Sequence, residues 1–273
     1  MSDHWLEALQ ALKGAIYQDK VYTALSILRQ RGRPDLSSLH LSELRVFSQN
    51  GEDGILHDLV SSLNPPSFFV SFGAGDGWSS NARLWADVFG WSGVAFEADK
   101  ASFDELSLRF GARKTLSAQN EWVLPENVND LLESNNVPNE FGILDIDIDG
   151  QDYWVWEAMS DHWKPQIVVC EYNSLFGNEL RVVEEKGHDV LEPTDTWGAS
   201  LRAVEELGRR KGYDLVYAEL AGVNAFFIRS DLNPGLSYSF VRTPNYGLRG
   251  LPHPPAVTHP LGGAESRPVC EVE

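Results

Sequence analysis

Two shortages, of cysteine and of basic residues, limit what this chain can be. Its 273 residues include only two cysteines, Cys170 and Cys270, so neither a disulfide framework nor a cysteine-based zinc site can be built. Lysine and arginine together number 22 against 40 acidic residues, which gives a formal net charge of −18. Because nucleic acids and anionic membranes attract cationic surfaces, neither is an expected partner.

Long apolar runs and a targeting signal are missing as well. No stretch approaches the roughly 20 apolar residues of a membrane span. The first residues, MSDHWLEALQALKG, do not have the basic start and apolar core of a secretory signal. We therefore expect a soluble cytoplasmic protein. The remaining composition, 42% hydrophobic and 23% charged, is that of a globular chain with room for one large α/β domain with attachments or for two small domains.

Hydrophobic periodicity divides the chain into three parts. Residues 1–47 carry apolar residues at helical spacing and predict an N-terminal helical segment, either a cap over the substrate mouth or a homodimer contact. Residues 48–235 alternate strand and helix patterns, which is typical of a parallel sheet with crossover helices. Within that part residues 174–196 are irregular, and the last two strand patterns suit an antiparallel hairpin. Residues 236–273 are rich in proline and glycine and predict an extended or partly disordered tail.

A glycine-rich turn follows the first strand pattern, FFVSF. Gly73, Gly75 and Gly77 let the backbone turn sharply and approach a ligand closely. Glu97 ends the next strand, where nucleotide-binding sheets hydrogen-bond a ribose. The turn contains Asp76 and neither lysine nor arginine, so it would repel a pyrophosphate and suits S-adenosylmethionine, a nucleoside with a cationic centre and no phosphate. The alternative is a tight turn and a solvent-facing strand end that bind nothing.

Carboxylates crowd the fourth strand pattern, in GILDIDIDGQDYWVW. Asp145, Asp147 and Asp149 occupy alternate positions, which share one face of a strand. The carboxyl ends of parallel strands meet at one edge of a sheet, and there the fifth strand pattern ends with Glu171 and Asn173. Carboxylate and amide oxygens are hard ligands that suit Mg²⁺, Mn²⁺ or Ca²⁺. A divalent ion held by Asp149, Glu171 and Asn173 would relieve the repulsion between the acids.

The same acids also have uses that require no metal. Asp149 or Asp152 can cap the helix that follows, and the acids can bind the ammonium group of a cofactor. In a metal-free site one of these acids, such as Asp147, or else His162 or His188, would act as general base. The sequence leaves the metal-bound and metal-free alternatives open.

The order of these motifs resembles that of the FkbM-type, S-adenosylmethionine-dependent methyltransferases over roughly residues 45–232. The resemblance lies in FSQNGEDGIL, FVSFGAGDG, WSGVAFEAD, ILDIDIDGQDYWVWEAM, PQIVVCEYN and NAFFIRSDL. It implies a Rossmann-like class I methyltransferase fold, with a seven-stranded, mostly parallel sheet and a C-terminal antiparallel hairpin. It also implies that the methionine part of the cofactor lies over residues 73–77, its ribose on Glu97 and its adenine near Asn120.

Most members of that family methylate oxygen atoms of sugars or secondary metabolites, so the resemblance implies a biosynthetic enzyme with a small-molecule acceptor. Asp147 and Asp149 would carry the catalysis, and a metal would orient the acceptor hydroxyl and lower its pKa. One position departs from the family pattern, since Ser71 stands where an acid is usual; Asp76 or the acids at 52–53 could replace it. Cofactor cyclisation, aminocarboxypropyl transfer and a noncatalytic binding role therefore stay open as alternatives.

Overall fold

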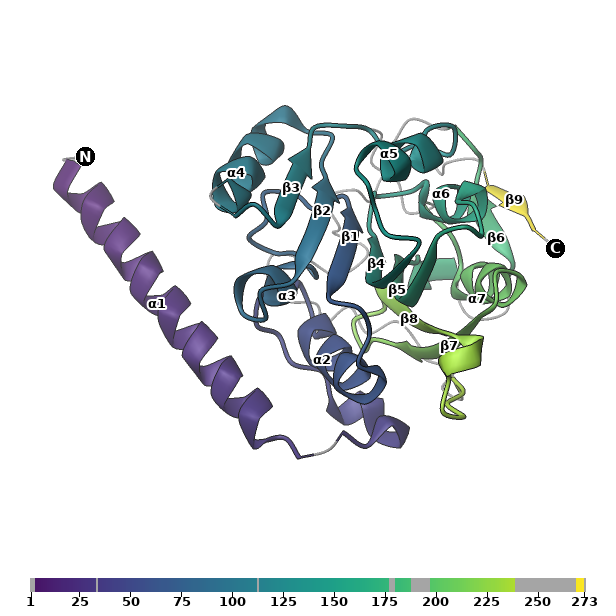
Figure 1. The fold of residues 1–273 in the computed structure, drawn as a ribbon, viewed down its shortest axis with the longest axis horizontal. Coiled ribbons are helices and arrows are strands. Elements are labelled where there is room, and N and C mark those ends of the chain that lie inside the picture. Colours follow the sequence, from purple (N-terminus) through teal and green to yellow (C-terminus); the bar gives the residue numbers. More distant parts are fainter. Residues whose placement is uncertain are drawn as a thin grey trace.

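The computed structural model describes residues 3–32, 34–111, 113–176, 180–187, 197–238 and 269–272. Its centre is a seven-stranded sheet in the order β3-β2-β1-β4-β5-β8-β7 (Figure 1). The strands β1 to β5 are parallel, and β8 runs antiparallel to both β5 and β7. This arrangement confirms the predicted Rossmann-like fold class. The strands are β1 (Phe68–Phe72), β2 (Ser92–Phe96), β3 (Leu116–Gln119), β4 (Glu140–Ile146), β5 (Lys164–Glu171), β7 (Tyr213–Ala218) and β8 (Asn224–Arg229).

Helices cover both faces of the sheet, and the strands supply a separate hydrophobic cluster to each face. Successive side chains of a strand point to opposite faces, so the neighbours Val168 and Val169 belong to different clusters. One face packs against α2 (Glu52–Leu63), α3 (Arg83–Asp87) and α4 (Lys100–Phe110). The other packs against α5 (Val128–Ser134), α6 (Asp152–Ala158) and α7 (Leu201–Arg210).

The N-terminal segment forms one long helix, α1 (Asp3–Gln30), followed by the 3₁₀ helix η1 (Leu36–Leu41). In Figure 1, α1 lies to the side of the sheet domain, and Ala24 and Leu28 near its end are buried in the cluster of the α2 face. Among the described residues, no helix is long and apolar enough to cross a membrane. A role for α1 as a substrate cap or a homodimer contact stays a prediction.

Helix α2 begins at Glu52, after a loop at residues 46–50. The Asp53 carboxylate Oδ2 accepts hydrogen bonds from the three consecutive backbone N–H groups of residues 46–48. These hydrogen bonds hold the segment as a loop in front of the helix. The helix ends at Leu63, with Asn64 in the left-handed conformation before two prolines.

A second, two-stranded sheet was not expected from the sequence. Strand β6 (Val182–Glu184) lies within the stretch that reads as irregular, and it pairs antiparallel with β9 (Val269–Glu271). The described end of the tail therefore contains a paired β-strand. Residues 239–268, which make up most of the predicted tail, lie outside the described residues.

Candidate functional site

One face of the sheet becomes polar at the carboxyl ends of its central strands. On β4, Ile143 packs in the cluster of the α2 face, and Asp145 lies on the same face two residues later. Ser71 on β1 is the register partner of Asp145, and Glu171 on β5 is the partner of Asn224 on β8. All four polar residues are buried. They form a row of polar side chains across β1, β4, β5 and β8, which we call the polar row.

The glycine turn begins directly after β1. The N–H groups of Gly73 and Ala74 both donate to the Phe96 carbonyl, at 3.0 and 3.1 Å. Gly73 has a φ of +75°, and a Cβ atom there would lie 1.7 Å from the Asp147 carbonyl oxygen, so no side chain fits. Gly75 has a φ of +58° and open space where its Cβ would be. The fold therefore requires Gly73, whereas Gly75 leaves a surface that a ligand can approach.

The predicted nucleoside-binding residues come together at the ends of β1, β2 and β3. The half-buried Glu97 accepts hydrogen bonds from the N–H groups of Gly75 and Asp99, both at 2.7 Å. The Asn120 side-chain amide donates to the carbonyls of Glu97 and Ala98, at 2.9 and 3.0 Å. Each carboxylate oxygen has a second acceptor position, so Glu97 can still accept hydrogen bonds from the hydroxyls of a ribose.

Two arginines hold the outer side of the turn. Arg109 Nε donates to the Asp76 carbonyl at 2.8 Å, and Arg83 donates to the Trp78 carbonyl at 2.8 Å. Both guanidinium groups stack on the Trp78 indole, 3.7 Å from the ring centre for Arg109 and 4.5 Å for Arg83. Gly77, with a φ of +71°, packs against the Arg109 side chain. No residue of the turn is cationic, but Arg83 and Arg109, which lie outside it, hydrogen-bond to its backbone and to the adjoining Trp78.

Ser71 contacts a carboxylate that the sequence did not suggest. Its hydroxyl donates to Asp145 Oδ2 at 2.9 Å, and the Asn81 side chain donates to Asp145 Oδ1 at 2.9 Å. Burial raises the pKa of Asp145 to about 6, although both hydrogen bonds favour its ionised form. The acid beside Ser71 therefore comes from the neighbouring strand, whereas Asp53, one of the expected replacements, binds the backbone of the loop before α2. Only the β1–β4 register reveals this contact.

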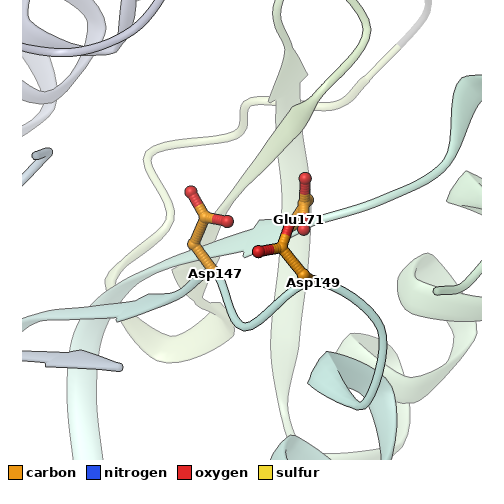
Figure 2. A group of neighbouring side chains, drawn as sticks. All are labelled: Asp147, Asp149 and Glu171. Carbon is orange, nitrogen blue, oxygen red and sulfur yellow. The ribbon is translucent and has the colours of Figure 1, made fainter. Parts of the chain in front are cut away.

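Three carboxyl groups gather just beyond β4 and at the end of β5 (Figure 2). Asp147, Asp149 and Glu171 each have an oxygen within 4.8 Å of the other two, and we call them the acidic triad. Glu171 is buried, Asp147 is half-buried and Asp149 is exposed. The structure thus brings together both predicted catalytic residues and one of the predicted metal ligands from the next strand.

The triad does not arise in the way that the alternating aspartates suggested. Strand β4 ends at Ile146, so Asp145 is the only one of the three aspartates inside the strand. Asp149 lies in a turn and has a φ of +58°, in the left-handed region. This turn, and not the pleat of a strand, brings Asp149 beside Asp147.

Asp152 shapes that turn. Its carboxylate accepts hydrogen bonds from the N–H groups of Ile148 and Gly150, both at 2.9 Å. Burial is the main reason that the pKa of Asp152 rises to about 7, and the charge of Asp149 adds to it. Asp152 is the first residue of α6 and holds the turn before the helix, so it is not the cap that the capping alternative anticipated; the N-cap residue is Gln151, which makes no side-chain capping hydrogen bond.

Burial and mutual repulsion dominate the electrostatics of the acidic triad. The pKa of Glu171 lies well above its usual range because the group is buried and because Asp147 and Asp149 are close. The pKa of Asp147 is raised well above its usual range for the same reasons, with Asp149 as its main charged neighbour. Among the described residues, Glu171 Oε2 is buried without a hydrogen-bond partner. Protons or a bound cation are needed to balance this charge.

The remaining candidates lie in different places. Asn173 is buried two residues beyond Glu171, and its side-chain amide nitrogen donates to the Trp197 carbonyl at 3.0 Å. His162 is exposed just before β5 begins, at the opposite edge of the sheet from the acidic triad. His188 lies outside the described residues.

Solved structures match this chain with low sequence identity and low TM-scores. No protein-family model and no curated protein sequence matches this chain. A putative caffeoyl-CoA O-methyltransferase from Staphylococcus aureus is 14% identical, with a TM-score of 0.46 over 78% of this chain and 99% of that one. A putative sarcosine dimethylglycine methyltransferase from Galdieria sulphuraria is 12% identical, with a TM-score of 0.41 over 66% and 85%. The N-terminal domain of EvdMO1, solved with SAH and D-fucose, is 10% identical, with a TM-score of 0.42 over 65% and 80%. Similarity this low assigns no activity, cofactor or substrate to this chain.

Proposed function

We propose that this chain is an S-adenosylmethionine-dependent methyltransferase that methylates an oxygen of a small molecule, as its resemblance to the FkbM-type enzymes implies. The observation that carries the proposal is the placement of the glycine turn and the acidic triad at one edge of the sheet. The turn follows β1 and the triad follows β4 and β5, which are neighbours in the strand order. A cofactor on the turn and an acceptor at the triad would therefore lie side by side.

The residues around the turn fit a nucleoside cofactor without phosphates. Gly75 leaves open space at the surface of the turn, Glu97 has acceptor positions to spare for ribose hydroxyls, and Asn120 holds the adjoining loop. The turn carries Asp76 and no cation of its own. When bound, S-adenosylmethionine would supply the electrophilic methyl group. The protein contributes position, because an in-line transfer depends mainly on the alignment of donor and acceptor.

The acidic triad fits a divalent cation. Asp147, Asp149 and Glu171 supply hard oxygen ligands, and Asn173 is the proposed amide ligand, although its amide nitrogen is held by the Trp197 carbonyl. A bound divalent ion would lower the pKa of an acceptor hydroxyl. Without metal, Asp147 is the proposed general base, because burial and its acidic neighbours raise its pKa and increase its affinity for a proton.

Thermal denaturation with S-adenosylmethionine or S-adenosylhomocysteine, each with Mg²⁺ or EDTA, tests the proposal. We expect both nucleosides to raise the melting temperature, and Mg²⁺ to raise it further. Glu97→Gln should weaken the nucleoside effect, whereas Glu105→Gln, the same change at an exposed position of α4, should not. The absence of any shift with either nucleoside would contradict the proposal.

A further inference from the structure

The polar row continues past the acidic triad onto β8. Asn224 is the register partner of Glu171 in an antiparallel pair. The adjacent Tyr172 N–H donates to the Val223 carbonyl at 2.8 Å, so Glu171 and Asn224 form the non-hydrogen-bonded pair, in which side chains lie closest. The Asn224 side chain, only 1% exposed, therefore lies directly beside the triad.

Asn224 connects the triad to two further buried acids. Its side-chain nitrogen donates to Glu52 Oε1 at 3.0 Å, and its backbone N–H donates to Glu219 Oε1 at 3.1 Å. The Asn50 side-chain nitrogen bridges the same two carboxylates, at 3.3 Å from Glu52 and 3.1 Å from Glu219. Both acids are fully buried. We call these four residues the Glu219 cluster.

Three oxygens of this cluster lack partners. Glu219 Oε2, Asn224 Oδ1 and Asn50 Oδ1 are buried and accept no hydrogen bond from any described residue. The amide orientations are fixed, because the nitrogen of each amide already donates to a carboxylate. A buried acceptor without a donor is costly. A ligand that satisfies these acceptors must bring donors, and a primary ammonium has three donors and no acceptor.

Charge points to the same ligand chemistry. Burial raises the pKa of Glu219 well above its usual range, and the nearby Glu52 and Glu43 add to the shift. A phosphate or carboxylate would be repelled by these acids. An ammonium group is compact, cationic and rich in donors, so it matches both the charge and the unpartnered oxygens.

We propose that the Glu219 cluster binds a primary ammonium group, and that the methyl acceptor is an amino alcohol rather than a phosphorylated or carboxylated molecule. The identification of this ligand as the acceptor rests on the proposed function, whereas ammonium binding does not. The methionine part of the cofactor also carries an ammonium group. Strand β8 lies on the far side of β4 and β5 from the glycine turn, which favours the acceptor as the source.

Three matched probes test the ligand chemistry: ethanolamine, ethylene glycol and glycolate share a two-carbon hydroxyl frame and differ in charge. By calorimetry, ethanolamine should bind at least about tenfold more tightly than ethylene glycol, because hydrogen bonds to charged groups are the stronger ones, and glycolate should bind least. This order should persist in protein saturated with S-adenosylhomocysteine. Methylthioadenosine lacks the amino-acid part of the cofactor and serves as the comparison. If S-adenosylhomocysteine abolishes ethanolamine binding and methylthioadenosine does not, the cluster binds the ammonium group of the cofactor, and the acceptor assignment is overturned.

Glu219→Gln keeps the shape of the side chain and removes its charge. It should weaken ethanolamine binding about tenfold or more and leave S-adenosylhomocysteine binding unchanged. Glu205→Gln, on the surface of α7, is the matched control and should behave as the wild type. If Glu219→Gln does not fold by circular dichroism, Glu52→Gln makes the same test. The proposal is refuted if the wild type binds the three probes equally. It is also refuted if the folded variant binds ethanolamine as tightly, relative to the other two probes, as the wild type does. Failure of the wild type to bind S-adenosylhomocysteine contradicts only the proposed function.

Discussion

Replacing Glu171 by glutamine tests the acidic triad directly, because the change keeps the side-chain shape and removes one charge. Oxygens of Glu171 and Asp147 lie at most 4.8 Å apart. At an effective dielectric constant of about 20, two ionised carboxylates at that separation repel each other by roughly 3.5 kcal/mol. This repulsion, together with burial, is the reason that both groups have a raised pKa. In metal-free protein they therefore retain protons well above the pH at which the unfolded chain loses them.

The direction of the pH effect follows from those raised pKa values. An acid that is harder to ionise in the folded state makes unfolding easier as the pH rises from its unfolded pKa toward its folded pKa. Metal-free wild-type protein should therefore lose stability as the pH rises above about 4, and Glu171→Gln should lose less. In EDTA, the melting temperature of the variant should exceed that of the wild type, by a margin that grows with pH.

With Mg²⁺ bound, the wild type should have a higher melting temperature than Glu171→Gln. Mg²⁺ at 100 times its dissociation constant stabilises a folded protein by about 2.7 kcal/mol, or roughly 5–10 °C for a domain of this size. We expect this shift in the wild type and its loss in Glu171→Gln, measured by thermal denaturation at several pH values. Glu133→Gln, on the exposed side of α5, controls for the loss of one charge. An equal Mg²⁺ shift in the wild type and in Glu171→Gln would refute a metal site at the triad.

Two further predictions follow from single contacts. Gly73→Ala should destabilise the fold severely, since its Cβ would lie 1.7 Å from the Asp147 carbonyl oxygen. Gly75→Ala has open space for its Cβ, so this variant should fold but bind S-adenosylhomocysteine more weakly. Equal melting temperatures of the two variants would contradict these different roles of Gly73 and Gly75. Burial raises the pKa of Asp53 to about 6, so the wild type should lose up to about 3 kcal/mol of stability between about pH 4 and pH 6. Asp53→Asn, which retains an acceptor oxygen for the loop amides, should flatten that part of the pH–stability curve in denaturant unfolding, and an unchanged slope would show that Asp53 does not titrate there.

The parts that the sequence predicted depend on local patterns. Alternating strand and helix periodicity predicted the order of elements in the seven-stranded sheet, and the glycine spacing predicted the turn after β1. The placement of acids at strand ends predicted that Asp147 and Asp149 approach Glu171, because parallel strands end at one edge. These inferences hold because each relies on neighbouring residues or on a general property of parallel sheets.

The parts that the sequence did not predict depend on pairing between distant segments. Strand β6 depends on its pairing with β9 and on a bridge to Ala199, and neither three-residue strand has a periodicity of its own. The contact between Ser71 and Asp145 requires the register of β1 against β4. The Glu219 cluster joins the loop before α2 to the β7–β8 hairpin, which lies about 170 residues away in the chain.

The sequence by itself determined that this chain forms a parallel sheet with a glycine turn and a concentration of acids at its carboxyl edge, because periodicity and residue type specify strands, turns and charge. Only the tertiary structure decided which acids share a site. A left-handed turn at Asp149 places it beside Glu171, the β1–β4 register assigns Asp145 to Ser71, and the pairing of β8 with β5 links the triad to Glu219. Electrostatic energy depends on distances in space, and those distances are set by register and turn geometry rather than by spacing along the chain.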